Sequence, residues 1–411
     1  MKVVVVGGGG REHALCRALA HDPEVTALVC APGNAGITQL AEVRPVDVAD
    51  PGAVAELAET VAADLVVIGP ELPLVAGAAD AVRARGIACF GPSAQAAQLE
   101  GSKAFAKEVM ASAKVSTARG YLCATPAEAA EALDTFGPPY VVKNDGLAGG
   151  KGVIVTSNRD EALAHAATCG QVVIEEYLDG PEVSLFAITD GQTVLPLTPA
   201  QDYKRVGEGN TGPNTGGMGA YSPLPWAPAD LVPEVLRIVL RPTVDEMRRR
   251  GIPFTGLLYA GLALTSRGIR VVEFNARFGD PETQVVLARL ATPLVGLLSA
   301  AAAGRLAEVE PPRWTGAAVT VAIAAENYPG TPRTGDVIDG LDAANAVEGA
   351  YVLHFGTAFD AGGRVVSSAG RVLTVVGAGP TIAEARSRAY RAVDYIKFPG
   401  AHHRRDIAQS V

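Results

Sequence analysis

The sequence predicts an α/β protein whose N-terminal domain is a doubly wound parallel sheet and whose remaining length forms further domains. The chain has 411 residues, which exceeds the size of one ordinary hydrophobic core. Hydrophobic residues make up 48% and charged residues 19%, as in a folded globular protein. Over residues 1–102, short runs that are apolar throughout alternate with alanine-rich helical stretches. Strands buried on both faces, with helices between them, are typical of such a sheet.

The N-terminal strands end in the loops "GGGGREH", "APGNAG", "GPELPL" and "GPS". Loops beyond the carboxyl ends of parallel strands form the expected ligand crevice. Gly7 to Gly10 do not fit the dinucleotide fingerprint G-x-G-x-x-G, because Glu12 or His13 stands where the third glycine belongs. The second strand also offers no acid for a ribose diol. These features disfavour a nicotinamide-dependent oxidoreductase, although the loop can still seat an anion or a sugar.

Three further blocks follow the N-terminal domain. Residues 119–186 predict a small α+β unit: strand, glycine-rich loop and strand in "YVVKNDGLAGGKGVIVT", a capped helix at 159–168, and two strands around a turn in "QVVIEEYLDGPEVSLFAIT". Residues 187–315 contain more strands, the long loop "DYKRVGEGNTGPNTGGMGAYSP" and a helix near 228–250. From 316 we expect strands and a helix in "TIAEARSRAYRAVDYI".

Charge and composition argue against several kinds of partner. Thirty-five basic and 44 acidic residues give a net charge of -9, which opposes sequence-independent binding to a nucleic-acid backbone. No apolar run reaches the length of a signal-peptide core or a membrane span. The five cysteines are scattered and form no CxxC pair. We therefore expect a soluble cytoplasmic protein without nucleic-acid or membrane partners.

The segment "VVKNDGLAGGKGV" places two lysines around a flexible loop. Lys143 stands at a strand end, and Lys151 follows a stretch with glycines at 146, 149 and 150. Glycines let successive amides close on phosphate oxygens, while lysines supply positive charge. The segment therefore predicts a phosphate cradle, although its spacing is not that of the P-loop. The alternative is a hairpin with two surface lysines.

The segment "VVIEEYLDGPEVS" suits an adenine hinge. Glu175 and Glu176 end an apolar strand, Leu178 follows, and Glu182 comes after a turn. Backbone groups with apolar neighbours can hold an adenine, and a nearby carboxylate can bind ribose hydroxyls. The alternative is a solvated acidic hairpin.

The segment "VVEFNARFGDPETQ" places two oxygen-bearing side chains on one face of a strand. Glu273 and Asn275 alternate with apolar residues, so both project the same way. Such oxygens suit magnesium, which often combines one or two protein groups with phosphates. Arg277 can then stabilise charge on a transferring phosphoryl group. The alternative is a strand that ends in solvated residues.

Together, these motifs resemble those of one family over nearly the whole chain. The segments quoted above, with "AAQLEGSKAF", follow the order found in the phosphoribosylamine–glycine ligases, which are ATP-grasp enzymes of purine synthesis. The resemblance implies an N-terminal substrate domain at 1–102, a central ATP-grasp domain at 103–118 and 187–315, a lid at 119–186, and a small α+β C-terminal domain at 316–411. It also implies that ATP converts glycine to glycyl phosphate, from which 5-phosphoribosylamine displaces phosphate.

The resemblance also implies the residues of the site. It implies ATP contacts at Lys103, Lys143, Gly149, Gly150, Lys151, Glu175, Leu178 and Glu182. It implies metal ligands, for Mg²⁺ or Mn²⁺, at Glu273 and Asn275, and catalytic roles for Arg277, Asp280 and Lys151. It implies a glycine pocket formed by Asp202, Lys204 and the backbone from Thr215 to Met218, including Gly217. It implies phosphoribosylamine contacts at Arg11, Glu12, Glu71, and Arg404 or Arg405; a solvated basic tail is the alternative for the last two.

Three departures from the family pattern bear on these expectations. The loop reads "GLAGGKG" where "GLAAGKG" is commoner, so Gly149 adds freedom. The helix at 159–168 meets the next strand almost directly, which shortens the lid. The strand "LLYAGLAL" lacks an acid that many ATP-grasp enzymes use for metal, so the number of metal ions stays open.

Several alternatives for function and assembly remain. They are another purine-pathway ATP-grasp ligase, such as a carboxylase or a formyl-transferring enzyme, and a nucleotide-binding regulator without catalysis. We expect a monomer that makes at most a transient contact with the enzyme that supplies phosphoribosylamine.

Overall fold

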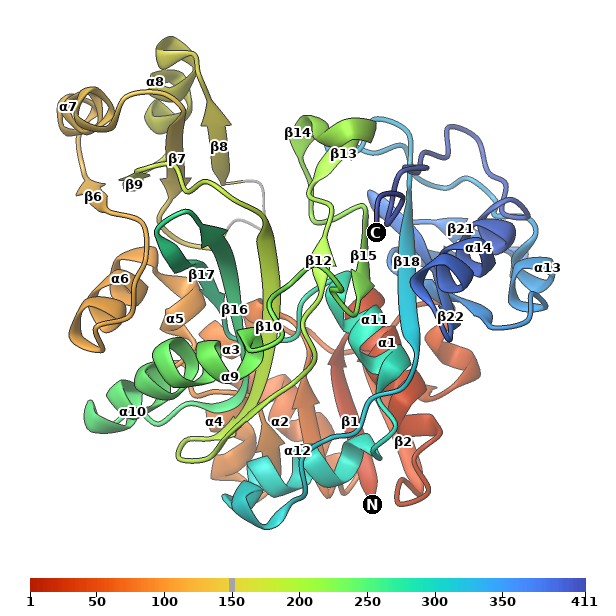
Figure 1. Ribbon diagram of the computed structural model, residues 1–411. Helices are drawn as coiled ribbons and strands as arrows, with labels where there is room; N and C mark the ends of the chain where they lie inside the picture. Colours follow the sequence, from red (N-terminus) through yellow and green to blue (C-terminus); the bar gives the residue numbers. More distant parts are fainter. Residues whose placement is uncertain (148–151) are drawn as a thin grey trace.

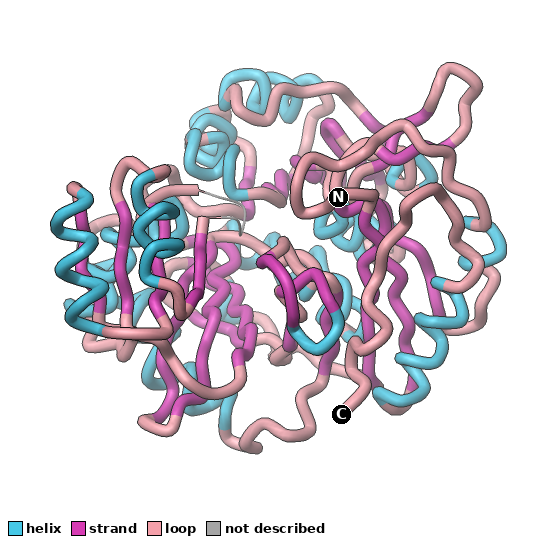
Figure 2. Tube along the Cα trace, turned by 90° about the horizontal axis from the view of Figure 1, so that it is seen from above, coloured by secondary structure: helices cyan, strands magenta, loops and turns pink. Residues whose placement is uncertain are grey.

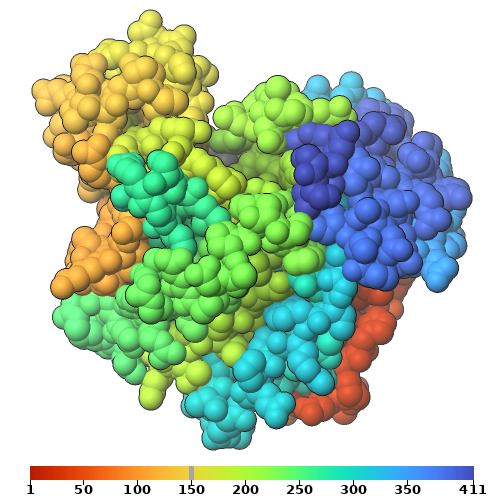
Figure 3. Space-filling model, viewed as in Figure 1, coloured from red at the N-terminus to blue at the C-terminus, as the bar shows by residue number. Residues whose placement is uncertain are grey.

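The computed structural model describes residues 1–147 and 152–411, in which four sheets of four or five strands carry the architecture (Figure 1). Three of these sheets form the body, and the fourth belongs to a lobe that stands apart from it at the upper left of Figure 3. Seen from above in Figure 2, helices lie mostly toward the outside and strands toward the middle. Within these described residues, no helix is both long and apolar enough to cross a bilayer.

The N-terminal sheet confirms the expected doubly wound domain. Its five strands are all parallel, in the order β3-β2-β1-β4-β5. Residues 3–6 are buried, because helices cover both faces of the sheet. The strands are β1 (Lys2–Gly7), β2 (Ala27–Pro32), β3 (Glu42–Val43), β4 (Leu65–Ile68) and β5 (Ala88–Phe90). The helices are α1 (Gly10–Ala20), α2 (Pro51–Thr60), α3 (Glu71–Ala76), α4 (Ala78–Ala84) and α5 (Gln98–Gly101).

The projecting lobe, called the lid below, contains an antiparallel sheet in the order β6-β9-β7-β8. Its strands are β6 (Gly120–Cys123), β7 (Tyr140–Asn144), β8 (Val153–Thr156) and β9 (Val172–Glu175). Its helices are α7 (Pro126–Phe136) and α8 (Arg159–Ala167). Leu133, Val142 and Ile174 lie in a small separate core. The short connection from α8 to β9 agrees with the shortened lid that the sequence indicates.

The central sheet is antiparallel, in the order β11-β10-β16-β17. Its strands are β10 (Glu182–Asp190), β11 (Val194–Pro196), β16 (Thr255–Thr265) and β17 (Gly268–Asn275). The helical segments around it are α6 (Lys103–Ser112), α9 (Leu231–Val235), the π-helical turn η3 (Leu236–Leu240), α10 (Arg241–Arg249), α11 (Glu282–Arg289) and α12 (Leu294–Ala302).

The structure corrects one expected pairing. The two strands of "QVVIEEYLDGPEVSLFAIT" form, as β9 and β10, but they do not pair as a hairpin. Both edges of β9 are already taken by β6 and β7, whereas β10 pairs with β11 and β16. Residues 176–181 therefore cross from the lid to the central sheet, and the expected lid range of 119–186 overlaps the central sheet at the start of β10.

The last large sheet joins the central and C-terminal parts of the chain. Its order is β12-β15-β18-β22-β19, and its first two strands come from the region before residue 316. The strands are β12 (Gln201–Asp202), β15 (Gly219–Ser222), β18 (Ala317–Ala324), β19 (Ala350–His354) and β22 (Arg371–Gly379). Helices α13 (Leu341–Asn345) and α14 (Ile382–Val393) accompany it. Two hairpins, β13–β14 (Arg205–Gly207, Thr211–Asn214) and β20–β21 (Thr357–Phe359, Val365–Ser367), complete the fold.

Candidate active site

Lys143 on β7 connects the lid to the central sheet. Its Nζ lies 2.6 Å from Oε2 of Glu175 and donates to the carbonyl oxygen of Val272 on β17 at 3.0 Å. Burial alone lowers the pKa of Lys143, but the carboxylates of Glu175 and Glu273 outweigh it and raise that pKa. The lysine-bearing strand of the lid therefore contacts β17 directly beside Glu273.

Glu175 is held between two lysines from different domains. Besides Lys143, Lys107 on α6 places its Nζ 2.5 Å from Oε1 of Glu175. Burial raises the pKa of Glu175, but these two cations outweigh it and lower that pKa. Lys107 is a site residue that the sequence analysis missed. It lies one helical turn after Lys103, and this spacing was the available signal.

The start of the glycine-rich loop is attached to the N-terminus of α6. Oδ1 of Asp145 accepts hydrogen bonds from the backbone N–H of Lys103 at 2.6 Å and of Ala104 at 3.4 Å. Nζ of Lys103 donates to the carbonyl oxygen of Gly146 at 3.0 Å. Asp145 was not foreseen. The expected contacts Gly149, Gly150 and Lys151 lie outside the described residues.

The crossing segment at 176–181 stands where the adenine hinge is expected. The carboxylate of Glu176 lies 3.1 Å from Nε of Arg119 and 3.3 Å from Nη2 of Arg267, so it joins the lid connection to the β16–β17 turn. Leu178 is half-buried in this segment. Glu182, at the start of β10, forms an ion pair with Lys204.

Glu273 and Asn275 end β17 as expected. Glu273 is half-buried, and Asn275 is buried with its Oδ1 accepting from Nη2 of Arg277 at 3.1 Å. Within the described part of the chain, no group of three or more His, Cys, Asp or Glu residues could hold a metal ion. A carboxylate beside a carboxamide instead fits a hard cation that takes its other ligands from phosphates and water.

Arg277 joins the central domain to the N-terminal domain. Its Nε lies 3.2 Å from Oε2 of Glu71 on α3, and its Nη2 lies 2.8 Å from Oε1 of Glu100 on α5. Burial raises the pKa of Glu71, but Arg277 and Arg11 outweigh it and lower that pKa to about 2. Burial raises the pKa of Glu100, and Arg277 only partly offsets it. Arg277 is thus a shared counter-ion for two carboxylates.

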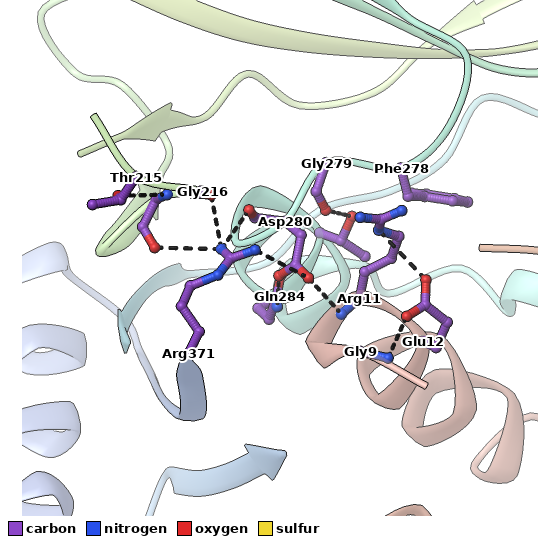
Figure 4. Close-up of polar contacts among 12 residues, drawn as sticks. Gly9, Arg11, Glu12, Thr215, Gly216, Phe278, Gly279, Asp280, Gln284 and Arg371 are labelled. Atoms are coloured by element: carbon purple, nitrogen blue, oxygen red, sulfur yellow. Dashed lines mark hydrogen bonds and ion pairs between the residues drawn. The ribbon is translucent and has the colours of Figure 1, made fainter. Parts of the chain in front are cut away.

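Asp280 lies against the N-terminus of α1 (Figure 4). Its Oδ2 is 3.4 Å from the backbone N of Arg11, and its Oδ1 accepts from Nε2 of Gln284 at 2.6 Å. Oε2 of Glu12 accepts from the N–H of Gly9 at 2.6 Å, and burial raises the pKa of Glu12. The structure therefore brings together the first glycine loop and the turn that follows β17.

The proposed glycine pocket lies beside β12. Lys204 is paired with Glu182 and lies 3.6 Å from Oδ1 of Asp202. Burial, together with the nearby carboxylates of Glu282 and Glu182, raises the pKa of Asp202 to about 7 against the effect of Lys204. Glu282 itself accepts from the hydroxyl of Tyr259 at 2.6 Å. The buried carboxyl groups of Asp202 and Glu282 give the pocket a negative character, which Lys204 partly offsets.

The loop that precedes β15 is held tightly against the turn after β17. The backbone N of Thr215 donates to the carbonyl oxygen of Lys204 at 2.8 Å. Gly217 has φ of +109°, and a Cβ there would lie 2.4 Å from Cδ of Pro281. A side chain at Gly217 is therefore excluded by both conformation and space. The side chain of Met218 is buried.

The two arginines of the C-terminal tail differ sharply in their surroundings. Arg404 is fully buried; its guanidinium bonds to Asp406 and to the carbonyl oxygen of Arg205, and stacks 4.9 Å from the ring centre of Tyr203. Arg405 is exposed. The guanidinium of Arg404 therefore stabilises the fold. Arg405 is the tail arginine whose exposed side chain could make the expected phosphate contact.

Comparison with known proteins agrees with this arrangement. The models for the N, ATP-grasp (A) and C domains of phosphoribosylglycinamide synthetase match residues 1–100, 101–283 and 318–410. The phosphoribosylamine–glycine ligase of Streptomyces coelicolor is 66% identical over 99% of this chain and 99% of its own length. The Mycobacterium leprae ligase is 57% identical over 100% of this chain and 98% of its own length.

Solved structures give the same result. The crystal structure of the Thermotoga maritima phosphoribosylamine–glycine ligase is 33% identical, with a TM-score of 0.86, and the match covers 99% of this chain and 100% of that one. A biotin carboxylase domain from Hydrogenobacter thermophilus, in complex with MgADP, is 19% identical with a TM-score of 0.74 over 98% of this chain and 91% of that one, which shows a shared fold.

The lid, its contacts with the central sheet, and the charged groups at those contacts are those of an ATP-grasp enzyme, a class of ATP-dependent ligase. Within that class, the chain belongs to the phosphoribosylglycinamide synthetase family.

Proposed function

We propose that the protein joins glycine to 5-phosphoribosylamine and converts ATP to ADP and phosphate. The observation that carries this proposal is the hydrogen bond from Lys143 of the lid to Val272, next to Glu273 on β17. This contact supports the proposal because it places the positive charge of the lid lysine close to the side-chain oxygens at the end of β17, as a bound triphosphate and its metal would require. Both are needed to bind a nucleotide and its metal.

ATP binds between the lid and the central sheet. Lys103 and Lys143 contact phosphates, Glu175 and Leu178 border the adenine, and Glu182 accepts from ribose hydroxyls. Glu273 and Asn275 would hold Mg²⁺ or Mn²⁺, which would neutralise phosphate charge. Lys151 and the glycines at 149 and 150 are assigned to the same phosphates from the sequence alone.

The first step activates glycine. A carboxylate oxygen of glycine attacks the γ-phosphorus, the bond to the β-phosphate oxygen breaks, and glycyl phosphate and ADP form. Asp202 and the backbone at 215–218 orient glycine, with the carboxylate of Asp202 facing its ammonium group. Arg277 stabilises negative charge on the transferring phosphoryl group, since its ion pairs with Glu71 and Glu100 fix its orientation.

The second step forms the amide. The amine of phosphoribosylamine attacks the glycyl carbonyl carbon, phosphate leaves with the electrons of the C–O bond, and the nitrogen releases a proton to the leaving phosphate. Arg11, Glu12 and Glu71 stand at the carboxyl ends of β1 and β4, where a ligand of a parallel sheet is expected. Asp280 lies against Arg11 and places this amine.

Product formation tests the proposed function directly. Purified protein is incubated with ATP, Mg²⁺, glycine, and phosphoribosylamine formed in place from ribose 5-phosphate and ammonia. We expect ADP release that depends on both co-substrates, and a new product with the mass of glycinamide ribonucleotide. ADP release with bicarbonate or formate in place of glycine would instead indicate another ligase. ATP binding without turnover under any combination would indicate a regulator.

The cellular location, the oligomeric state and the supply of phosphoribosylamine are also proposed. We assign the protein to the cytoplasm, as a monomer that receives labile phosphoribosylamine through a transient contact with the enzyme that makes it. The five cysteines are all free thiols, which suits a reducing compartment.

The raised pKa of Asp202 predicts pH-dependent glycine binding. Its carboxyl group is half ionised at about pH 7, and only the ionised form attracts an ammonium group. We expect the Michaelis constant for glycine to fall by about tenfold between about pH 6 and about pH 8, and Asp202→Asn to remove most of that change. Steady-state kinetics at saturating ATP measure it, with the exposed Asp230→Asn as the control. An unchanged pH profile in Asp202→Asn would contradict the assignment.

The exposed tail arginine predicts a selective effect on phosphoribosylamine. Arg405→Ala should raise the Michaelis constant for phosphoribosylamine by about tenfold and that for ATP by much less. Only the phosphate of phosphoribosylamine is expected to pair with the cation at this position. Initial rates with each substrate varied in turn measure this, and Arg391→Ala on the exposed face of α14 is the matched control. Equal effects on both constants would refute the phosphate role.

A further inference from the structure

Arg371, the first residue of β22, links the C-terminal domain to two turns of the proposed site (Figure 4). Its Nη1 donates to the carbonyl oxygens of Gly216 at 2.8 Å, Gly217 at 3.3 Å and Asp280 at 2.8 Å. Its Nη2 lies 3.7 Å from Oδ2 of Asp280. One guanidinium group therefore holds the turn before β15 and the turn after β17 together.

The surroundings of Arg371 keep this guanidinium in one place. It stacks on the ring of Phe355 at 4.4 Å from the ring centre, and its side chain is only 17% exposed. A Cβ at Gly216 would lie 2.9 Å from Cζ of Arg371, and a Cβ at Gly10 would lie 2.3 Å from the Phe355 ring. The two glycines thus allow a stack that runs from the turn at 216, through Arg371 and Phe355, to the first residue of α1.

The two turns need a donor of this kind. Gly216, Gly217 and Asp280 lie outside helices and strands, so their carbonyl groups have no ladder partner, and leaving such groups unpaired at an interface is costly. Pro281, which packs against Gly217, has no N–H to offer. A guanidinium can serve several acceptors at once from a planar fork, which a lysine ammonium on a flexible stem cannot reproduce.

Hydrogen bonds extend from the clamped turns to both proposed substrate pockets. On one side, Gly217 N donates to Oγ1 of Thr215 at 2.9 Å, and Thr215 N donates to the carbonyl oxygen of Lys204 in the glycine pocket. On the other side, Oδ2 of Asp280 faces the backbone N of Arg11 in the loop assigned to phosphoribosylamine. Among the described residues, the side-chain hydrogen bonds and ion pair of Arg371 are confined to these two turns.

We propose that Arg371 is the positioning residue for the acceptor side of the reaction: it fixes the turns at 215–217 and 279–281 so that glycine and phosphoribosylamine meet. This inference rests on the proposed function. The nucleotide side, formed by Lys103, Lys143 and Glu175, is held by α6, β7, β9 and β17 and does not depend on Arg371. The C-terminal domain thus contributes to amide formation without contacting a reacting atom.

Kinetics and nucleotide binding together test the proposal. In Arg371→Ala we expect a rise of about tenfold or more in the Michaelis constant for glycine and a similar fall in kcat, while the dissociation constant for a non-hydrolysable ATP analogue changes by less than about threefold. Arg371→Lys should lie between this variant and the wild type, and added guanidinium ion should restore part of the activity of Arg371→Ala. The exposed Arg364→Ala, in the β20–β21 turn, is the matched control.

An activity-free measurement separates this inference from the proposed function. Hydrogen–deuterium exchange of Arg371→Ala, or of Arg371→Lys if the alanine variant does not fold, should be faster than wild type at 215–218 and 279–284 and unchanged in the lid strands. Faster exchange in the variant, together with no glycine-dependent turnover in the wild type, would contradict the proposed function but still support the role of Arg371 in fixing the two turns. Unchanged exchange at both turns, or equal losses of glycine and nucleotide affinity, would contradict the proposed role of Arg371.

Discussion

Glu273→Ala should lower kcat by about 10³-fold or more and leave the fold intact. Glu273 stands at the tip of β17 beside the lid lysine, and its charge contributes to the raised pKa of both Lys143 and Lys204. Its side chain is half-buried, and among the described residues it has no ion-pair partner. When Glu273 is removed, Lys143 and Lys204 keep their ion pairs with Glu175 and Glu182, so the main loss is expected at the metal and phosphate site.

Activity and stability need to be measured on the same samples. Turnover is followed by ADP release at saturating Mg²⁺, and the fold by circular dichroism and the midpoint of thermal unfolding. Glu310→Ala changes an exposed carboxylate outside the proposed site and serves as the control. Near-normal turnover in Glu273→Ala at high Mg²⁺ would count against the metal assignment. A midpoint that falls with the activity would indicate a structural role instead.

The fold was largely predictable because its strongest local signals agree with its tertiary structure. Residues 3–6 form an uninterrupted apolar run, and such a run is stable only inside a sheet covered on both faces. The strands around 172–190 show the limit of this reasoning. Their sequence predicts two strands and a turn. It does not show that β9 pairs with β6 and β7 rather than with β10, because β6 and β7 come from earlier parts of the chain.

Site residues could be predicted where a charged side chain stands in an otherwise apolar strand. They could not be predicted where the residue becomes part of the site only through tertiary contacts. Lys143 and Glu273 lie near the ends of the apolar strands β7 and β17, where a charged side chain indicates a partner or a function. Arg371 begins an ordinary apolar strand and reaches Asp280 only through folding across 91 residues. Arg404 shows the reverse error: a basic tail suggests a free cation, but its side chain is fully buried against Asp406.

Arg277 should be the replacement that most affects stability and activity together. Its guanidinium lies 3.2 Å from Glu71 and 2.8 Å from Glu100, and both carboxylates are largely buried. Removing one partner of a buried ion pair leaves an uncompensated charge, which costs about 3–5 kcal/mol. We therefore expect Arg277→Met to lower the free energy of unfolding by about this amount at neutral pH and to reduce kcat by about 10²-fold or more.

The pH dependence of this loss distinguishes the ion pairs from simple packing. Glu71 has its folded pKa depressed to about 2 from 4.5, so its contribution is fully present above its unfolded pKa and is lost as the pH falls through about 2. In Arg277→Met this contribution to stability is lost. Protonation of the unpaired carboxylates of Glu71 and Glu100 then removes their buried charge. The difference in unfolding free energy between wild type and variant should therefore be largest near neutral pH. It should begin to shrink above pH 4.5, because burial raises the pKa of Glu100 above that value.

Urea unfolding of wild type and Arg277→Met at several pH values measures this difference. The triple variant Arg277→Met with Glu71→Gln and Glu100→Gln removes all three charges, and it should recover most of the lost stability but none of the activity. Recovery of both would remove Arg277 from the reaction. A loss of stability that is independent of pH and persists in the triple variant would assign the effect to packing, because neutral side chains of similar size cannot carry an electrostatic penalty.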